Sequence, residues 1–212
     1  MLTLIAAAGL ALSMATAPAT APASSDPPND RIVVDVETVN GSGCSPGTAA
    51  VAVSSDNTAF TVTYSDYLAQ IGPGAAPIDF RKNCQLNLVV HVPHGFTYAI
   101  AQADYRGFAH LAKGARGYQQ AGYYIQGTSP TSRIGHNFDG PHSDNWQTTD
   151  RKEVHELVFA PCGEERSLNI NTELRVYEGS SDADKNTSFM TMDSTDGSVN
   201  TEYHFAWKKC KT

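Results

Sequence analysis

The 212-residue sequence lacks the features that would identify a membrane helix or a familiar active site. Beyond its first two dozen residues, no stretch approaches 18 consecutive apolar residues, which excludes a membrane-spanning helix there. No window carries a sustained 3.6-residue apolar repeat, so helices are not expected to build the fold. Cys-x-x-Cys pairs, a nucleophile elbow and a zincin helix are all missing. The sequence therefore predicts no catalytic residue, metal or cofactor.

Basic residues are also scarce. The chain has 15 Lys and Arg against 22 Asp and Glu, which gives a formal net charge of -7. An acidic surface repels phosphate backbones, so nucleic acid is not expected as a partner. The short cluster of Lys208, Lys209 and Lys211 is interpreted as a solvated strand end.

The N-terminus has the composition of an export signal. An apolar run from Leu2 to Met14 leads into small-residue repeats that end in Ala21-Pro22-Ala23. This pattern is typical of a secretory signal peptide over residues 1–23, and it predicts a secreted, extracellular protein without a membrane span. Residues 24–30 are polar, contain Pro-Pro and are predicted to form a disordered leader. Residues 31–212 are predicted to form a single β-sandwich domain.

An even number of cysteines in an exported chain favours disulfides over metal ligation. The chain has Cys44, Cys84, Cys162 and Cys210, which allow three connectivities. We favour Cys44 with Cys84 and Cys162 with Cys210, because each of these pairs joins strands that neighbour each other in the sequence. On the chain-entropy model, each bridge is worth about 4 kcal/mol.

Period-two alternation dominates the rest of the sequence. Apolar and polar residues alternate over 60–65, 85–92 and 168–176, which predicts strands with one buried and one solvated face. Turn residues at 55–57, 93–95 and 196–197 predict antiparallel neighbours. Residues 66–71 are predicted to form at most a helical turn or two. The fold class is therefore predicted to be all-β, a two-sheet antiparallel β-sandwich stapled by two disulfides.

The most polar segment runs from residue 136 to residue 146 and contains Gly140-Pro141, so it is interpreted as a loop. Imidazoles and carboxylates together can bind a divalent metal, and a loop beside an exposed Trp can hold a sugar. The spacing matches no known metal motif, so no metal site is predicted. The candidates for a ligand contact here are His136, Asp139, His142, Asp144 and Trp146.

A second candidate is the solvated face of the strand over 168–177. Amides, an ion pair and an aromatic ring at alternate positions can match sugar hydroxyls, although any half-exposed strand needs polar outward residues. Its ligand-binding candidates are Asn169, Asn171, Glu173, Arg175 and Tyr177. The aromatic residues Tyr123, Tyr124, Tyr203, Phe205 and Trp207 are assigned mainly to core and edge packing.

Two further segments resemble sites only in part. Asp182-Ala183-Asp184-Lys185-Asn186 is similar to the opening of a calcium loop, but the required Gly and bidentate Glu are missing, which favours an ordinary polar turn. Glu153, His155, Glu156, Glu164 and Glu165 could supply a carboxylate pair for hydrolysis. Alternation with Val154, Leu157 and Val158 favours the solvated face of a strand instead.

Several segments resemble an uncharacterised secreted family, the domain of unknown function 4360. They are Gly41 to Cys44, Asp56 to Tyr67, Arg81 to Leu86, Tyr105 to Phe108, and Trp207 to Cys210. The resemblance extends from Ile32 to Cys210. It implies export, one β-rich domain and the cysteine framework, and it implies no reaction.

Three hypotheses for function follow. The first is a secreted binding protein that acts at the cell surface or in the medium, with a cell-wall polysaccharide or an extracellular protein as its partner. The second is an extracellular protease inhibitor that presents the loop from Ile71 to Lys82, which contains Pro73, Gly74 and Pro77. The third is a hydrolase whose site assembles from distant strands.

Overall fold

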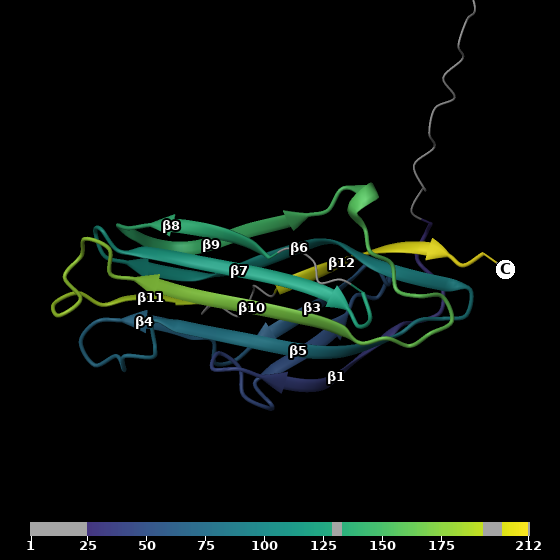
Figure 1. The fold of residues 1–212 in the computed structure, drawn as a ribbon, viewed down its shortest axis with the longest axis horizontal. Helices are drawn as coiled ribbons and strands as arrows, with labels where there is room; N and C mark the ends of the chain where they lie inside the picture. Colours follow the sequence, from purple (N-terminus) through teal and green to yellow (C-terminus); the bar gives the residue numbers. More distant parts are fainter. Residues whose placement is uncertain (1–24, 129–132, 193–200, 212) are drawn as a thin grey trace, which may run out of the picture.

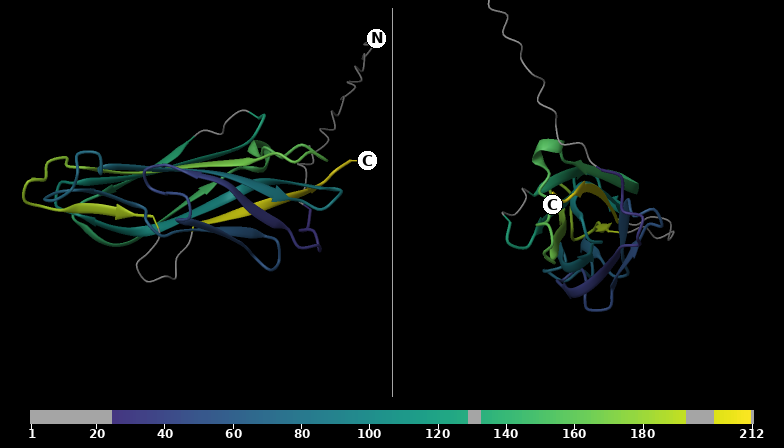
Figure 2. Two further views of the ribbon diagram at one scale, coloured as in Figure 1. Left: turned by 90° about the horizontal axis from the view of Figure 1, so that it is seen from below. Right: turned by 90° about the vertical axis from the view of Figure 1, so that its right-hand side faces the viewer.

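The computed structural model describes residues 25–128, 133–192 and 201–211. These residues form two antiparallel sheets packed face to face, which confirms the predicted β-sandwich. The molecule is elongated along the strands, and an end-on view shows the strands enclosing a shared interior (Figure 2). In the described part of the chain, the one helical element is the 3-10 turn η1 (Val154–Glu156).

The first sheet has five strands in the order β1-β5-β10-β7-β8. Figure 1 shows it in front, with β1 at the bottom and β8 at the top. Its central strand, β10, pairs over its whole length with β7 and from Leu168 to Arg175 with β5, which fixes the register on each side. The bounds are β1 (Val33–Asn40), β5 (Arg81–His91), β10 (Leu168–Tyr177), β7 (Arg116–Ile125) and β8 (Ile134–Asp139).

The second sheet has seven strands and is organised around the long strand β6. On one side β6 pairs first with β12 and then with β11, and on the other side it pairs with β9. The bounds are β2 (Ala49–Val53), β3 (Ala59–Tyr64), β12 (Thr201–Lys209), β6 (Phe96–Leu111), β11 (Ser188–Thr191), β4 (Leu68–Ile71) and β9 (His142–Arg151).

The segment predicted as a polar loop over residues 136–146 is instead formed by parts of two strands and the turn between them. β8 is an edge strand of the first sheet and β9 an edge strand of the second, so the Gly140-Pro141 turn carries the chain from one sheet to the other. The prediction was wrong because the pairing partners that extend this segment, β7 and β6, are distant residues that its local composition does not reveal.

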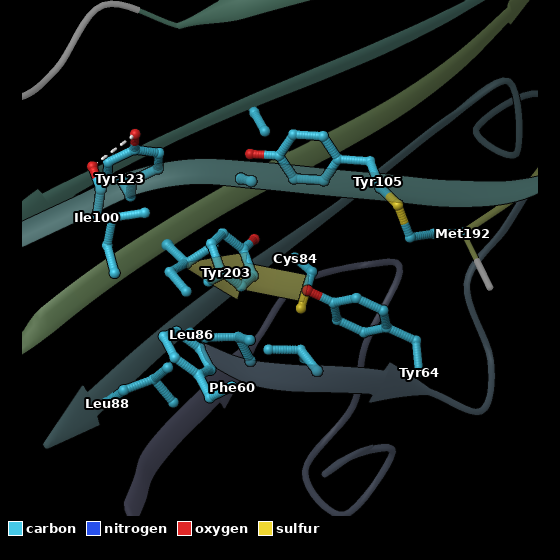
Figure 3. Packing of buried hydrophobic residues seen from close by; sticks show 14 of the residues in the cluster. Phe60, Tyr64, Cys84, Leu86, Leu88, Ile100, Tyr105, Tyr123, Met192 and Tyr203 are labelled. Carbon is cyan, nitrogen blue, oxygen red and sulfur yellow. Dashed lines mark hydrogen bonds between the residues drawn. The ribbon is translucent and has the colours of Figure 1, made fainter. Parts of the chain in front are cut away.

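Between the sheets lies a core that is rich in tyrosine. The rings of Tyr105 and Tyr123 pack edge-on against Tyr203, which stacks on Phe60 with 5.1 Å between ring centroids (Figure 3). Burial raises the pKa of the Tyr105 and Tyr203 phenols well above their usual value. Of the aromatic residues assigned to packing, Tyr124 is half-exposed, whereas Tyr123, Tyr203, Phe205 and Trp207 are buried.

Both predicted disulfides are confirmed, Cys44–Cys84 and Cys162–Cys210. The elements that they join are not neighbours in sequence. Cys44 follows β1 and bonds to β5, the strand with which β1 pairs. Cys162 lies in the crossover from β9 to β10 and bonds to Cys210 just after β12. The second bridge thus ties the crossover between the sheets to the end of the chain.

Residues 25–30, for which the composition predicts a disordered leader, lie against the sandwich. The Ser25 backbone N–H donates to the Trp207 carbonyl at 2.8 Å. The Asn57 side-chain amide donates to the carbonyls of Pro28 and Asp30 at 2.8 and 2.9 Å. These contacts join the segment to β12 and to the turn between β2 and β3, whereas the predicted signal peptide at residues 1–23 lies outside the described residues.

The structure differs from the local predictions at residues 68–71 and 153–158. Residues 68–71 form strand β4 rather than a helical turn, because they pair with the distant strand β11. The expected strand around Glu153 to Val158 is absent from the described structure, which has η1 there. The turn predicted at Asp196-Gly197 lies outside the described residues.

No helix among the residues that the structure describes has the length and apolar character needed to cross a membrane.

Candidate functional site

The outer face of the five-stranded sheet is a polar surface built from alternate residues of its three central strands. Cross-strand register places Asn171 opposite Gln85 on one side and opposite Gly122 on the other. The same register aligns the remaining outward positions into rows across the sheet. We call this surface the outer face, and it comprises Arg81, Asn83, Gln85, Asn87, Val89, His91, Arg116, Tyr118, Gln120, Gly122, Tyr124, Asn169, Asn171, Glu173, Arg175 and Tyr177.

Glu173 is a buried charge at the Arg81 end of this face. Its side chain is 6% exposed, and its two carboxylate oxygens accept hydrogen bonds from Arg81 Nη2 and Arg175 Nε. The hydrogen bond with Glu173 also raises the pKa of the Arg175 guanidinium. Arg81 and Arg175 are direct cross-strand partners, an arrangement of like charges that is unfavourable without an anion. Glu173 therefore holds two guanidinium groups side by side, 43% and 34% exposed.

A shallow depression of about 40 Å³ lies beside this cluster. It is lined by residues of β5, β10 and β7 and by Arg133, just before β8. Gly122 makes room for Arg133, because a Cβ at position 122 would stand 3.0 Å from Arg133 Cγ. In the described structure, Arg133 forms no ion pair with a carboxylate. The guanidinium groups of Arg81 and Arg133 and the carboxylate of Glu173 thus line the depression, and Arg175 lies beside it as the second partner of Glu173.

The opposite end of the outer face is neutral and then acidic. Asn87 Nδ2 donates to Asn169 Oδ1 at 3.0 Å. Next along β5, the His91 ring nitrogens contact Asp35 at 2.9 Å and Glu165 at 3.0 Å. The hydrogen bond with Asp35, reinforced by the charge of Glu165, raises the pKa of His91. The outer face therefore changes from basic near Arg81 to acidic near Asp35.

Aromatic side chains border the basic end. Arg175 Nη1 donates to the Tyr177 hydroxyl at 3.3 Å, and Gln120 Nε2 donates to the Tyr118 hydroxyl at 2.9 Å. Rings combined with amides and guanidinium groups provide apolar contact area together with hydrogen-bond donors and acceptors. This combination suits a ligand that has both hydroxyl groups and apolar ring faces.

The other predicted site, over residues 136–146, is not assembled. Trp146 is 4% exposed and packs against Phe138 with 5.3 Å between ring centroids. His136 Nε2 contacts the buried carboxylate of Asp150 at 2.7 Å. These side chains point between the sheets, whereas Asp139 and Asp144 face solvent at the turn. The exposed Trp that the sequence suggested is thus part of the core.

The remaining candidates form local contacts. Asp182 accepts hydrogen bonds from Asp184 N and Lys185 Nζ at 3.1 and 2.5 Å, which makes residues 182–186 a self-capped polar turn. Glu156 accepts a hydrogen bond from the Glu153 backbone, while Glu164 pairs with Arg166 and Glu165 with His91. Within the described ranges, no three His, Cys, Asp or Glu side chains form a group that could hold a metal ion.

The sequence hypotheses for this face omitted residues from other strands. Arg81, Tyr118, Gln120 and Arg133 lie in segments that only the sheet order brings beside β10. Period-two alternation marked Gln85 and Asn87 as outward positions but not as neighbours of Asn171 and Asn169. A sequence signal for the depression does exist in Gly122, an outward strand position with no side chain.

Comparisons with known proteins give a family but no activity. Residues 30–210 match the family described as "Domain of unknown function (DUF4360)". A protein of Arthroderma benhamiae, described as "Uncharacterized secreted protein", is 34% identical over 197 residues. That alignment covers 92% of this chain and 79% of the relative.

Proposed function

The chain belongs to the DUF4360 family, and we propose that it is a secreted, non-enzymatic protein that binds a cell-wall polysaccharide through the outer face of its five-stranded sheet. Export is supported by the two disulfides, which persist in oxidising compartments, and by the description of the relative as secreted. The relative has no described ligand, so the choice of ligand rests on the chemistry of the surface.

The observation that carries the proposal is the continuous row of amide, guanidinium and phenol groups on β5, β10 and β7. Side-chain amides both donate and accept hydrogen bonds, as sugar hydroxyls do. Strand pairing on both sides of β10 holds these groups at fixed spacing, so little conformational entropy is lost when a ligand binds. An extended, shallow surface of this kind suits a linear polymer better than a small molecule, which needs a deeper pocket.

Co-sedimentation tests the proposal. Residues 24–212 are mixed with insoluble peptidoglycan, chitin and β-glucan in salt that screens weak charge contacts. We expect retention on at least one polymer and a loss of retention for Asn171→Ala, because Asn171 lies at the centre of the face. Asn145→Ala is the matched control, since Asn145 is an exposed residue of β9 in the other sheet. No retention on any polymer, or equal loss in both variants, would contradict the proposal.

A second candidate function is protease inhibition by the loop between β4 and β5. Ile78 is 75% exposed in this loop, which is an unusual position for a large apolar side chain. Asp79 accepts a hydrogen bond from Ala76 N at 2.9 Å and pairs with Lys82 at 2.8 Å, so the loop is braced internally. Inhibition assays with a serine, a cysteine and a metalloprotease test it, with Ile78→Asp as the inactive control.

A further inference from the structure

We infer that the ligand of the outer face is an acidic polysaccharide whose uronate carboxylates bind at the guanidinium cluster of Arg81, Arg133 and Arg175. This inference rests on the proposed function and adds the charge of the polymer and its place on the face. The main observation behind it is that positive charges cluster at this place in a chain whose formal net charge is -7.

A buried carboxylate holds two of the three guanidinium groups in place. Glu173 is almost fully buried, and its carboxylate occupies one N–H edge of each flanking guanidinium. Arg81 and Arg175 remain partly exposed, so their other N–H groups are available to a second anion. A guanidinium binds a planar carboxylate through two parallel hydrogen bonds, a geometry that a lysine ammonium cannot provide. Glu173 is therefore a positioning residue for two carboxylate-binding groups.

Arg133 supplies the third cation from a different direction. Its aliphatic stem lies over Gly122, across the depression from Arg81 and Glu173. Because no acidic side chain in the described residues pairs with it, Arg133 adds a positive charge that is not neutralised within the protein. A ligand carboxylate in the depression would thus contact guanidinium groups on two sides.

The neighbouring side-chain amides can bind the hydroxyl groups of the same sugar unit. Asn83, Gln85, Gln120 and Asn171 line the same depression, and each can donate to or accept from a hydroxyl. At the far end of the face, Asp35 and Glu165 surround His91 and would repel an anion. An acidic polymer is consequently favoured at the Arg81 end and disfavoured at the Asp35 end.

The test compares one polymer with and without its charge. Binding of residues 24–212 to polygalacturonate and to the same polymer after full methyl esterification is measured by isothermal titration calorimetry. Methyl esterification removes the carboxylate charge and keeps the sugar backbone. We expect polygalacturonate to bind at least about tenfold more tightly, and this preference to shrink between about 0.05 M and about 0.5 M NaCl.

Matched arginine variants locate the contact. Arg133→Gln should weaken binding to polygalacturonate about three- to tenfold and leave binding to the ester unchanged, since it removes one charged contact from an exposed position. Arg151→Gln makes the same charge change on β9 of the other sheet and should change neither affinity. Thermal denaturation of both variants should match that of the parent chain, which separates binding from folding.

The outcomes separate the inference from the proposed function. Equal binding to polygalacturonate and its ester would overturn the acidic ligand and leave polysaccharide binding in place. Equal weakening by Arg133→Gln and Arg151→Gln would also overturn the inference, because it would show that binding depends on the net charge of the protein and not on the guanidinium cluster. Failure to bind these polymers, together with no retention on peptidoglycan, chitin or β-glucan, would overturn both.

Discussion

The segments 136–146 and 168–177 are both rich in polar and aromatic residues, yet they lie in opposite environments. β10 is the central strand of its sheet, so one of its faces is covered by the core and the other is open to solvent. β8 and β9 are edge strands of different sheets, and their inward side chains close the sandwich along that side. Composition thus does not distinguish a solvent-exposed sheet face from an edge where the two sheets meet, whereas strand position does.

The largest expected difference between the two segments is in stability. Trp146→Ala should lower the free energy of unfolding by about 3–5 kcal/mol, because it removes a buried ring that packs against Phe138 and leaves a cavity. Tyr177→Ala should lower it by less than about 0.5 kcal/mol, since Tyr177 is exposed. Urea denaturation of both variants measures the two values. A small effect of Trp146→Ala would mean that the edge where the sheets meet does not contribute to the core.

The next expected effect concerns Asp150, the buried acid of the β8–β9 hairpin. Asp150→Ala should lower the free energy of unfolding by about 1–3 kcal/mol, because His136 Nε2 loses its acceptor and is left partly buried. Asp144→Ala, at an exposed position of the same hairpin, should change it by less than about 0.5 kcal/mol. Equal values for the two variants in urea denaturation would show that the His136–Asp150 contact is not a stabilising link between β8 and β9.

Polysaccharide binding should depend on the outer face and not on the β8–β9 hairpin, which is the reverse of the order expected for stability. Tyr177→Ala should weaken retention on the bound polysaccharide about five- to tenfold, because it removes an exposed ring and the hydroxyl that accepts from Arg175. Asp139→Ala, exposed at the turn of the hairpin, should leave retention unchanged. Binding isotherms on the insoluble polymer measure both. A loss in the Asp139 variant alone would move the site from the outer face to the β8–β9 hairpin.

The smallest effect is the pH dependence at the acidic end of the outer face. Asp35 and Glu165 raise the pKa of His91, so the folded state binds its proton more tightly than the unfolded state, whose pKa is about 6.5. The stabilisation is therefore complete below about pH 6.5 and is lost as the pH rises through the folded pKa. Because His91 is exposed, solvent screening keeps the contribution small.

An NMR titration of the His91 ring protons measures this shift directly. Asp35→Asn should return the pKa of His91 toward about 6.5, since it removes the dominant hydrogen bond to a charged partner. Asp144→Asn serves as the control for a change of net charge without contact. An unchanged titration midpoint in Asp35→Asn would show that Asp35 does not raise the pKa of His91.

Local patterns predicted the parts of the fold that depend on near neighbours. Alternation over residues 168–176 identified β10 and its outward side chains, and turn residues at 93–95 identified the connection from β5 to β6. The same reasoning failed at residues 68–71 and 136–146, where pairing with β11 and with β6 and β7 decided the structure. Strand pairing over long sequence separations overrides the preference of a short segment.

The sequence by itself determined an all-β fold, the four cysteines and a strand with Asn169, Asn171, Glu173, Arg175 and Tyr177 on one face. Only the tertiary structure decided that β5 and β7 flank this strand, which brings Arg81 and Arg133 to Glu173 and buries Trp146 elsewhere. The physical reason is that side-chain period is a local property of a strand. Which face meets the core, and which charges meet across a sheet, depend on pairing between distant segments.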